Sequence, residues 1–120
     1  ETYAATAIPP TWRLLLALAC HYDWEVEQID FIGAFLNADL DVQVYIEIPE
    51  GLLEFLRQLG PNEPTYGYNP QEDQVIQLLH TLYGLKQSPR QWQLKLTKLL
   101  ESLGFKQLVS DPAVFTNAEK

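Results

Sequence analysis

The sequence has no methionine, a single cysteine and two histidines. One cysteine excludes a disulfide within the chain, which agrees with an intracellular protein. Because Cys20 lies in an apolar segment, we expect it to be buried in packing. His21 and His80 have no cysteine or second histidine at metal-ligand spacing, which argues against a zinc site. A chain that begins with Glu1 and lacks an initiator methionine is expected to be an excised piece of a longer protein.

Long apolar runs and a signal-peptide pattern are also lacking. The apolar run at residues 14–20 has seven residues, whereas a membrane-spanning helix needs about 18. Hydrophobic residues nevertheless make up 47% of the chain and aromatic residues 12%, which excludes a disordered chain. The 120 residues therefore predict one globular domain or a piece of one.

Basic residues are scarce in the first part of the chain. Residues 1–73 carry thirteen acidic residues and two basic ones, whereas residues 74–120 carry six basic and three acidic residues. The net charge of −8 argues against a surface that attracts nucleic acid everywhere. Residues 74–120 could bind phosphates through one basic face. Alternatively, the uneven charge distribution could reflect only surfaces exposed to solvent.

Hydrophobic periodicity and the positions of proline and glycine predict the secondary structure. We expect helices at residues 11–22, 52–59 and 88–103, a turn at 33–36, and strands at 24–30, 42–48, 74–79 and 113–116. Gly104 is expected to end the last helix. Prolines, asparagines and acids at residues 60–73 predict a surface loop. This order favours an α+β fold, an antiparallel sheet with helices packed on one face, in a ferredoxin-like arrangement.

The segment LYGLKQSPRQW, residues 82–92, combines features that suit a phosphate. Gly84 allows close approach to the main chain. Ser88 and Pro89 predict a helix N-cap followed by a first-turn proline. Lys86 lies beside this helix start, where main-chain N–H groups favour anions. An ordinary loop that leads into a helix is the alternative.

Asp30 ends the expected strand at residues 24–30, and the small-residue turn FIGAF follows it. A carboxylate beside exposed main-chain amides is what a metal-bound triphosphate requires. A solvated aspartate at a strand end is the alternative. Asp39 and Asp41, close to Asn37, are expected to be turn residues, and so is Asp111 before a proline.

The two segments and their flanks resemble one family. QIDFIGAFLNADLDVQVYIEIPEG followed by LYGLKQSPRQW is similar to the reverse transcriptase of Ty1/copia-type retrotransposons. ETYAATA, WRLLLALA and SDPAVF match the same family in the same order, so the resemblance covers almost the whole chain. It implies part of the fingers and palm of a right-hand polymerase.

The resemblance implies a role for each matched position. Asp30 would be a catalytic residue and a ligand for Mg²⁺ or Mn²⁺ in a two-metal nucleotidyl transfer. Phe35 would lie under the sugar and disfavour a 2′-hydroxyl, with core packing as its alternative. Tyr83 stands where many retroviral relatives carry glutamine. The positions implied to bind the incoming nucleotide are Phe31, Gly33, Ala34, Phe35, Gly84 and Lys86, and those of the template and helix start are Gln87, Ser88, Pro89 and Arg90.

The sequence also departs from the family pattern. No aromatic-x-Asp-Asp segment supplies the second carboxylate cluster, and one carboxylate cannot hold two ions in the required geometry. We therefore expect this chain by itself not to polymerise nucleotides. A non-catalytic, retrotransposon-derived interaction module and an unrelated ferredoxin-like domain are the alternatives.

The resemblance further implies a set of partners. These are a primer-template of RNA or DNA, a deoxynucleoside triphosphate, and the remainder of a polyprotein, with no membrane. An unpaired sheet edge could also lead to self-association. The expected location is intracellular: cytoplasmic, in virus-like particles, or nuclear.

Overall fold

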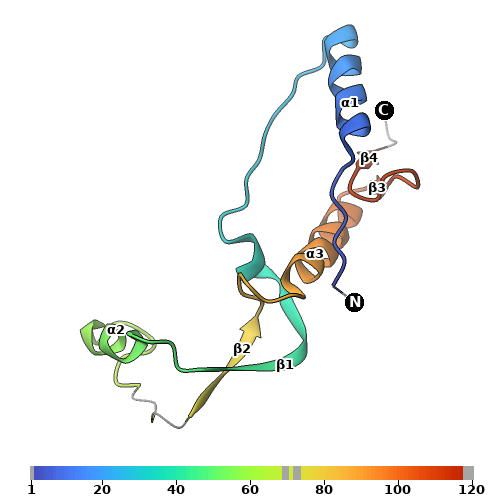
Figure 1. Ribbon diagram of the computed structural model, residues 1–120. Coiled ribbons are helices and arrows are strands. Elements are labelled where there is room, and N and C mark those ends of the chain that lie inside the picture. Colours follow the sequence, from blue (N-terminus) through green and yellow to red (C-terminus); the bar gives the residue numbers. More distant parts are fainter. Residues whose placement is uncertain (1, 69–70, 72–73, 118–120) are drawn as a thin grey trace. The chain divides into compact units, whose positions relative to one another are not determined.

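The computed structural model describes residues 2–68, 71 and 74–117. They belong to two compact units, residues 1–39 with 80–120 and residues 40–79, which are described separately below. The elements are α1 (Pro9–Tyr22), the 3₁₀ turn η1 (Ala34–Asn37), β1 (Asp39–Glu47), α2 (Leu52–Gln58), β2 (Val75–His80), α3 (Ser88–Ser102), β3 (Phe105–Gln107) and β4 (Phe115–Asn117) (Figure 1).

Helices and two small antiparallel sheets make this an α+β fold, as the sequence predicts. The strands pair as β1 with β2 and as β3 with β4. The described strands thus form two separate sheets, and the single sheet with helices packed on one face is not formed by them. Among the described residues, no helix combines the length and apolar character that crossing a membrane requires.

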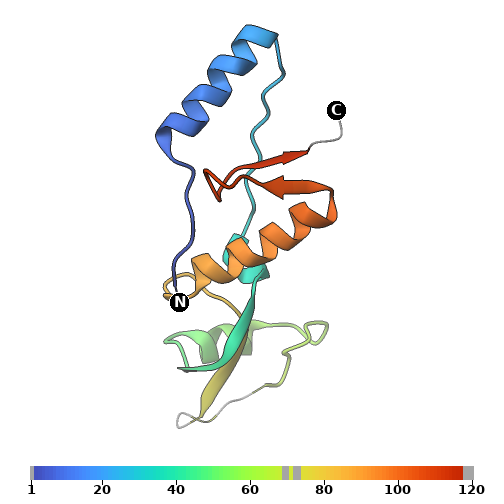
Figure 2. The ribbon, with the colours of Figure 1, turned by 90° about the vertical axis from the view of Figure 1, so that its right-hand side faces the viewer.

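In the first unit, helix α3 leads directly into the β3–β4 hairpin (Figure 2). Gly104 follows the helix with φ +86° and donates its N–H to Glu101 O at 3.0 Å, which confirms the predicted helix end. In the hairpin Phe105 lies opposite Asn117, and Lys106 lies opposite Thr116. The last strand therefore begins two residues later than predicted, and the short β3 is an element that the sequence pattern did not indicate.

An extended N-terminal segment, residues 3–8, is tied to α3 and to the hairpin loop. The carbonyl of Tyr3 accepts a hydrogen bond from Arg90 Nη1 at 3.3 Å, and the Ala5 N–H donates to Gln93 Oε1 at 2.8 Å. The N–H of Ile8 donates to a carboxylate oxygen of the hairpin loop at 3.0 Å. These three bonds hold the segment that leads into α1.

Helix α1 begins with two prolines and is followed by the C-cap residue Asp23, whose φ of 55° is left-handed. Ala19 is its buried residue, whereas Cys20 is exposed, so the prediction of a buried cysteine is wrong. Helical spacing shows which residues share a face, but it does not show whether another segment covers that face. The large apolar side chains exposed on this helix are Trp12, Leu14, Leu15, Leu16 and Tyr22.

The predicted strand at residues 24–30 is also wrong, because these residues are extended and exposed without strand pairing. Residues that favour strands form one only where a partner edge is available, and that partner is not a local property. Asp39 and Asp41 lie in β1 and not in a turn. Alternation at residues 42–48 had marked this strand, and it begins three residues earlier than predicted.

The second unit contains most of the β1–β2 sheet and helix α2. Gly51, with φ +81°, precedes α2, and Leu56 is the buried residue of this helix. Residues 60–68 and 71 are exposed. The remaining residues of the predicted loop at 60–73, namely 69, 70, 72 and 73, lie outside the described residues.

Candidate nucleotide site

The segment that follows Asp30 forms a tight turn. Gly33 adopts φ +61° and precedes η1. Its carbonyl accepts hydrogen bonds from the N–H of Leu36 at 2.9 Å and from Asn37 Nδ2 at 3.0 Å. A Cβ atom at Gly33 would lie 3.3 Å from Leu36 Cδ1, so both the φ angle and the space favour glycine here.

The second segment also turns on a glycine with positive φ. Gly84 has φ +95°, and no heavy atom lies within 4 Å of the position that its Cβ would occupy. Its main chain is exposed and open to another molecule, as the sequence predicts. Lys86 follows in the same loop and is exposed.

The helix start differs from the prediction by one residue. Gln87 is the N-cap residue of α3, and Ser88 is already helical, with Pro89 next to it in the first turn. Ser88 is fully buried, and its hydroxyl donates back to the carbonyl of Leu82. The hydroxyl therefore closes the loop at residues 82–88 and does not cap the helix.

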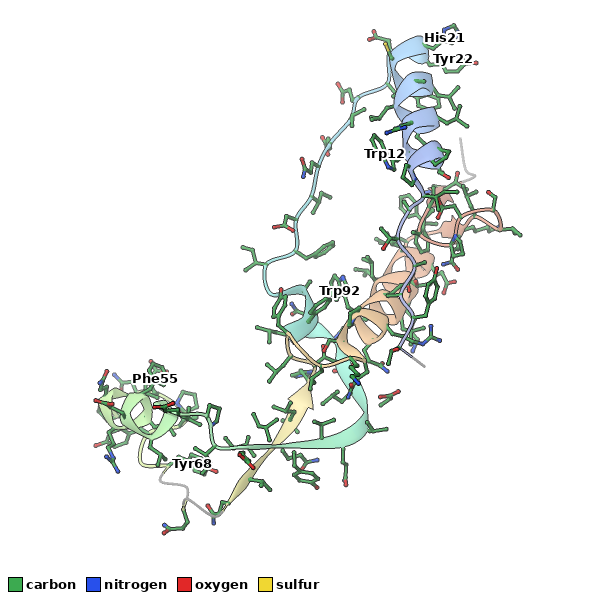
Figure 3. All side chains as sticks on the ribbon, viewed as in Figure 1. Trp12, His21, Tyr22, Phe55, Tyr68 and Trp92 are labelled. Atoms are coloured by element: carbon green, nitrogen blue, oxygen red, sulfur yellow. The ribbon has the colours of Figure 1, made fainter. Side chains whose placement is uncertain are left out.

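Aromatic contacts bring the two segments together. The rings of Phe31 and Trp92 meet edge to face, with centroids 5.1 Å apart. The rings of Phe35 and Tyr83 are tilted by 45°, with centroids 4.8 Å apart. Trp92 projects from α3 toward η1 in Figure 3. These two ring contacts, together called the aromatic cluster below, thus join residues more than 45 positions apart.

Main-chain carbonyls of the turn are held by two side chains. The Thr81 hydroxyl donates to Phe35 O, and the Thr81 N–H donates to Ala38 O at 2.8 Å. Lys95, from α3, donates its ammonium to Asn37 O. Thr81 has an exposed fraction of 0%. No sequence pattern indicated Thr81 or Lys95, because a contact between distant segments leaves no local periodicity.

A polar group at the start of β1 was missed as well. Asp39 Oδ1 lies 3.0 Å from His80 Nδ1, and Asp39 Oδ2 lies 3.8 Å from Lys95 Nζ. The Asp39 side chain is 72% exposed. Exposed ion pairs of this kind contribute little to stability, so this cluster does not hold the two segments together by itself.

Beside Phe35 there is an apolar hollow of about 230 Å³. Pro89 and Trp92 line it from the start of α3, and Ala5 lines it from the N-terminal segment. Phe35 is half-buried there. The ring therefore packs against protein while part of it faces solvent, an arrangement that suits both the packing role and the sugar-contacting role.

Asp30 directly precedes Phe31 of this cluster and lies in the exposed segment before the turn. Among the described residues, no three histidine, cysteine, aspartate or glutamate side chains gather as a metal site. Mg²⁺ is commonly bound through one or two carboxylates together with substrate phosphates and water. The exposed carboxylate of Asp30 fits one such ligand, but the described residues do not supply a complete site.

A family model for reverse transcriptase (RNA-dependent DNA polymerase) matches residues 1–119. The chain belongs to the reverse transcriptase family. The match covers both segments of the aromatic cluster, so the family assignment and the observed contacts concern the same residues. A search of solved structures gives no match to this reverse transcriptase chain.

Curated relatives are polyproteins of plant and yeast retrotransposons. The chain is 37% identical over 103 residues to the retrovirus-related Pol polyprotein from transposon TNT 1-94 of Nicotiana tabacum, covering 86% of this chain and 7% of that protein. It is 32% identical over 115 residues to the Pol polyprotein from transposon RE1 of Arabidopsis thaliana, covering 96% of this chain and 7% of that protein. The chain is also 30% identical over 105 residues to the transposon Ty1-BL Gag-Pol polyprotein of Saccharomyces cerevisiae. This match covers 87% of this chain and 5% of that protein.

These relatives confirm the resemblance to Ty1/copia-type elements and do not favour the alternative of an interaction module. The chain spans about 5–7% of the length of these relatives. It is therefore a reverse transcriptase segment of the kind found in retrotransposon Pol polyproteins.

Proposed function

We propose that this chain supplies part of the nucleotide-binding site of an RNA-directed DNA polymerase. The observation that carries the proposal is the joining of residues 30–38 to residues 81–92, through the Phe31–Trp92 and Phe35–Tyr83 ring contacts and the Thr81 hydrogen bonds. An exposed carboxylate, a partly exposed small-residue turn and an exposed loop with a lysine come from these two segments. That combination suits a deoxynucleoside triphosphate.

Each segment has its own part in the proposal. Gly33 and Ala34 present the turn amides to the phosphates, and Phe35 lies under the sugar. Gly84 lets the nucleotide approach the main chain, and the exposed Lys86 neutralises phosphate charge. Gln87, Ser88, Pro89 and Arg90 shape the helix start on the template side, where Ser88 acts by closing the loop onto Leu82.

Asp30 would hold a divalent ion together with the phosphates of the nucleotide, in the company of carboxylates from elsewhere in the complete polymerase. Such an ion supplies charge stabilisation and activates the primer 3′-hydroxyl during in-line displacement. The exposed position of Asp30 suits this role. In the complete polymerase we propose that these elements belong to the fingers and a ferredoxin-like palm, which the family and the α+β content support.

Templated primer extension by the complete polymerase that contains this chain tests the proposal. Asp30→Asn should lower incorporation by at least about a hundredfold, because a ligand for the ion is lost. Asp41→Asn is the matched control, since it removes an exposed carboxylate of β1 that lies outside the two segments, and it should leave incorporation within about twofold. Equal incorporation by wild type and Asp30→Asn would contradict the proposed role of Asp30.

Binding to the primer-template has a separate test. The basic residues of the 74–120 part should contact phosphates, so affinity should fall steeply as the salt concentration rises. Fluorescence anisotropy with a labelled primer-template duplex across a salt series measures this dependence. A flat response would exclude phosphate contacts by this part of the chain.

A further inference from the structure

Two of the polar side chains in the described residues are fully buried, those of Thr81 and Ser88. A buried hydroxyl cannot turn to water, so its bonding partner fixes its role. The hydroxyl of Ser88 bonds within its own loop, to Leu82 O. The hydroxyl of Thr81 instead bonds to Phe35 O, 46 positions away in the sequence.

The Phe35 carbonyl has two donors with different effects. The Ala38 N–H donates to it at 3.0 Å, and this bond closes the turn itself. The Thr81 hydroxyl ties the closed turn to the segment that leads into LYGLKQSPRQW. Removal of the Thr81 hydroxyl therefore leaves the turn bond in place and releases one of the ties between the two segments.

The same short segment also contacts the ring of Phe35. Tyr83, two residues after Thr81, places its ring centroid 4.8 Å from that of Phe35. The Thr81 N–H adds a third tie through Ala38 O at 2.8 Å. Residues 81–83 thus hold both the main chain and the ring of Phe35.

We propose that Thr81 is a positioning residue for Phe35, and that its buried hydroxyl sets how strongly the polymerase discriminates against ribonucleotides. This inference rests on the proposed function, in which the Phe35 ring lies under the sugar. Thr81 is fully buried and does not touch the nucleotide. Steric rejection of one added oxygen depends on displacements of a fraction of an ångström, so a looser Phe35 admits the 2′-hydroxyl.

A purely structural role for Thr81 makes a different prediction. It would lower stability when the hydroxyl is lost and would leave the choice between sugars unchanged. Thr81→Val keeps the shape and removes the hydroxyl, whereas Thr81→Ser keeps the hydroxyl. Thr116→Val, at an exposed threonine of β4, is the matched control for the same chemical change elsewhere in the unit.

The readout is the ratio of kcat/KM for a deoxynucleotide to kcat/KM for the matching ribonucleotide, measured in the complete polymerase that contains this chain. Thr81→Val should lower this ratio by about three- to tenfold, the range that one hydrogen bond supplies. Thr81→Ser and Thr116→Val should stay within about twofold of wild type. If Thr81→Val does not fold, Thr81→Cys takes its place, because it is similar in size and donates only weakly.

A second readout needs no catalysis. With 4-fluorophenylalanine at position 35, the ¹⁹F resonance should move in Thr81→Val and stay in place in Thr81→Ser and Thr116→Val. A folded Thr81→Val protein with an unchanged ratio and an unchanged resonance overturns the inference alone. A wild-type polymerase that incorporates no nucleotide overturns the proposed function, and the inference about sugar selection with it.

Discussion

The main-chain N–H of Ile8 donates to Oδ2 of Asp111 at 3.0 Å, joining residues 103 positions apart. The second carboxylate oxygen of Asp111 accepts from the Ala113 N–H at 3.2 Å, and Val114 N–H donates to Asp111 O at 3.0 Å. The turn expected at Asp111 is therefore confirmed. The same aspartate, 2% exposed, also anchors the residues just before α1.

Replacement of this aspartate tests the anchor. Asp111→Ala should lower the melting temperature by several degrees, because the N–H groups of Ile8 and Ala113 lose their acceptor. Circular dichroism across a thermal ramp measures the change. Asp41→Ala, at an exposed position of β1, is the control and should change the melting temperature by much less.

The same aspartate should make stability depend on pH. Hydrogen bonding from the Ile8 N–H is the main cause that holds the pKa of Asp111 below its ordinary value of 3.8; the Thr11 side chain and the Ala113 N–H add to this, and burial opposes it. The stabilisation is therefore complete above the ordinary pKa and is lost as pH falls through the lower pKa of the folded state.

We expect the difference in melting temperature between wild type and Asp111→Asn to persist from pH 7 to pH 5. It should shrink as the pH falls below the ordinary pKa of 3.8, because the wild-type carboxylate then becomes protonated. Thermal ramps at a series of pH values measure this difference. A difference that does not change with pH would contradict the role of the charged carboxylate.

The contact between Phe31 and Trp92 predicts a coupling energy. A double-mutant cycle with Phe31→Leu and Trp92→Leu should give about 0.5–1.5 kcal/mol in urea unfolding. The stacked pair Tyr22 and Trp24, whose centroids are 5.4 Å apart, is exposed and provides the comparison. We expect its coupling to be smaller, and a zero coupling for Phe31 with Trp92 would contradict the aromatic cluster.

Substitution of Gly84 should lower stability because of the positive φ angle of its main chain and not because of crowding around a new side chain. Gly84→Ala should cost about 1 kcal/mol of stability, since φ is +95° and the space around its Cβ position is open. Gly60→Ala is the matched control, because its Cβ position is also open and its φ lies outside the left-handed range. It should be neutral or slightly stabilising, and equal losses in both variants would show that φ is not the cause.

Elements with strong local patterns were predictable from the sequence. The alternation at residues 42–48 located β1, and apolar spacing between Pro89 and Gly104 located α3. What failed depended on distant partners. Residues 24–30, expected as a strand, pair with no other strand. The Ser88 hydroxyl bonds to Leu82 O instead of capping the helix. The Thr81 hydroxyl bonds to Phe35 O, 46 positions away in the sequence.

The candidate site divides in the same way. The two segments could be recognised as a pair by their resemblance to one family, and the structure adds the ring contacts that join them. The hydrogen bonds from Thr81 and Lys95 to the turn could not be predicted, because the local sequence around a threonine or a lysine does not indicate which distant carbonyl its side chain will bond.

In the proposed function, the loop at residues 82–88 and the turn at 33–38 bind one nucleotide. This site is tested by measuring the KM for the incoming deoxynucleotide in the complete polymerase, for Lys86→Ala and for Lys106→Ala. Both substitutions remove an exposed lysine. Lys86→Ala should raise this KM about five- to tenfold through loss of a charge-assisted phosphate contact, while Lys106→Ala should leave it unchanged. An unchanged KM in Lys86→Ala, with primer-template binding intact, would contradict a nucleotide site formed by these two segments.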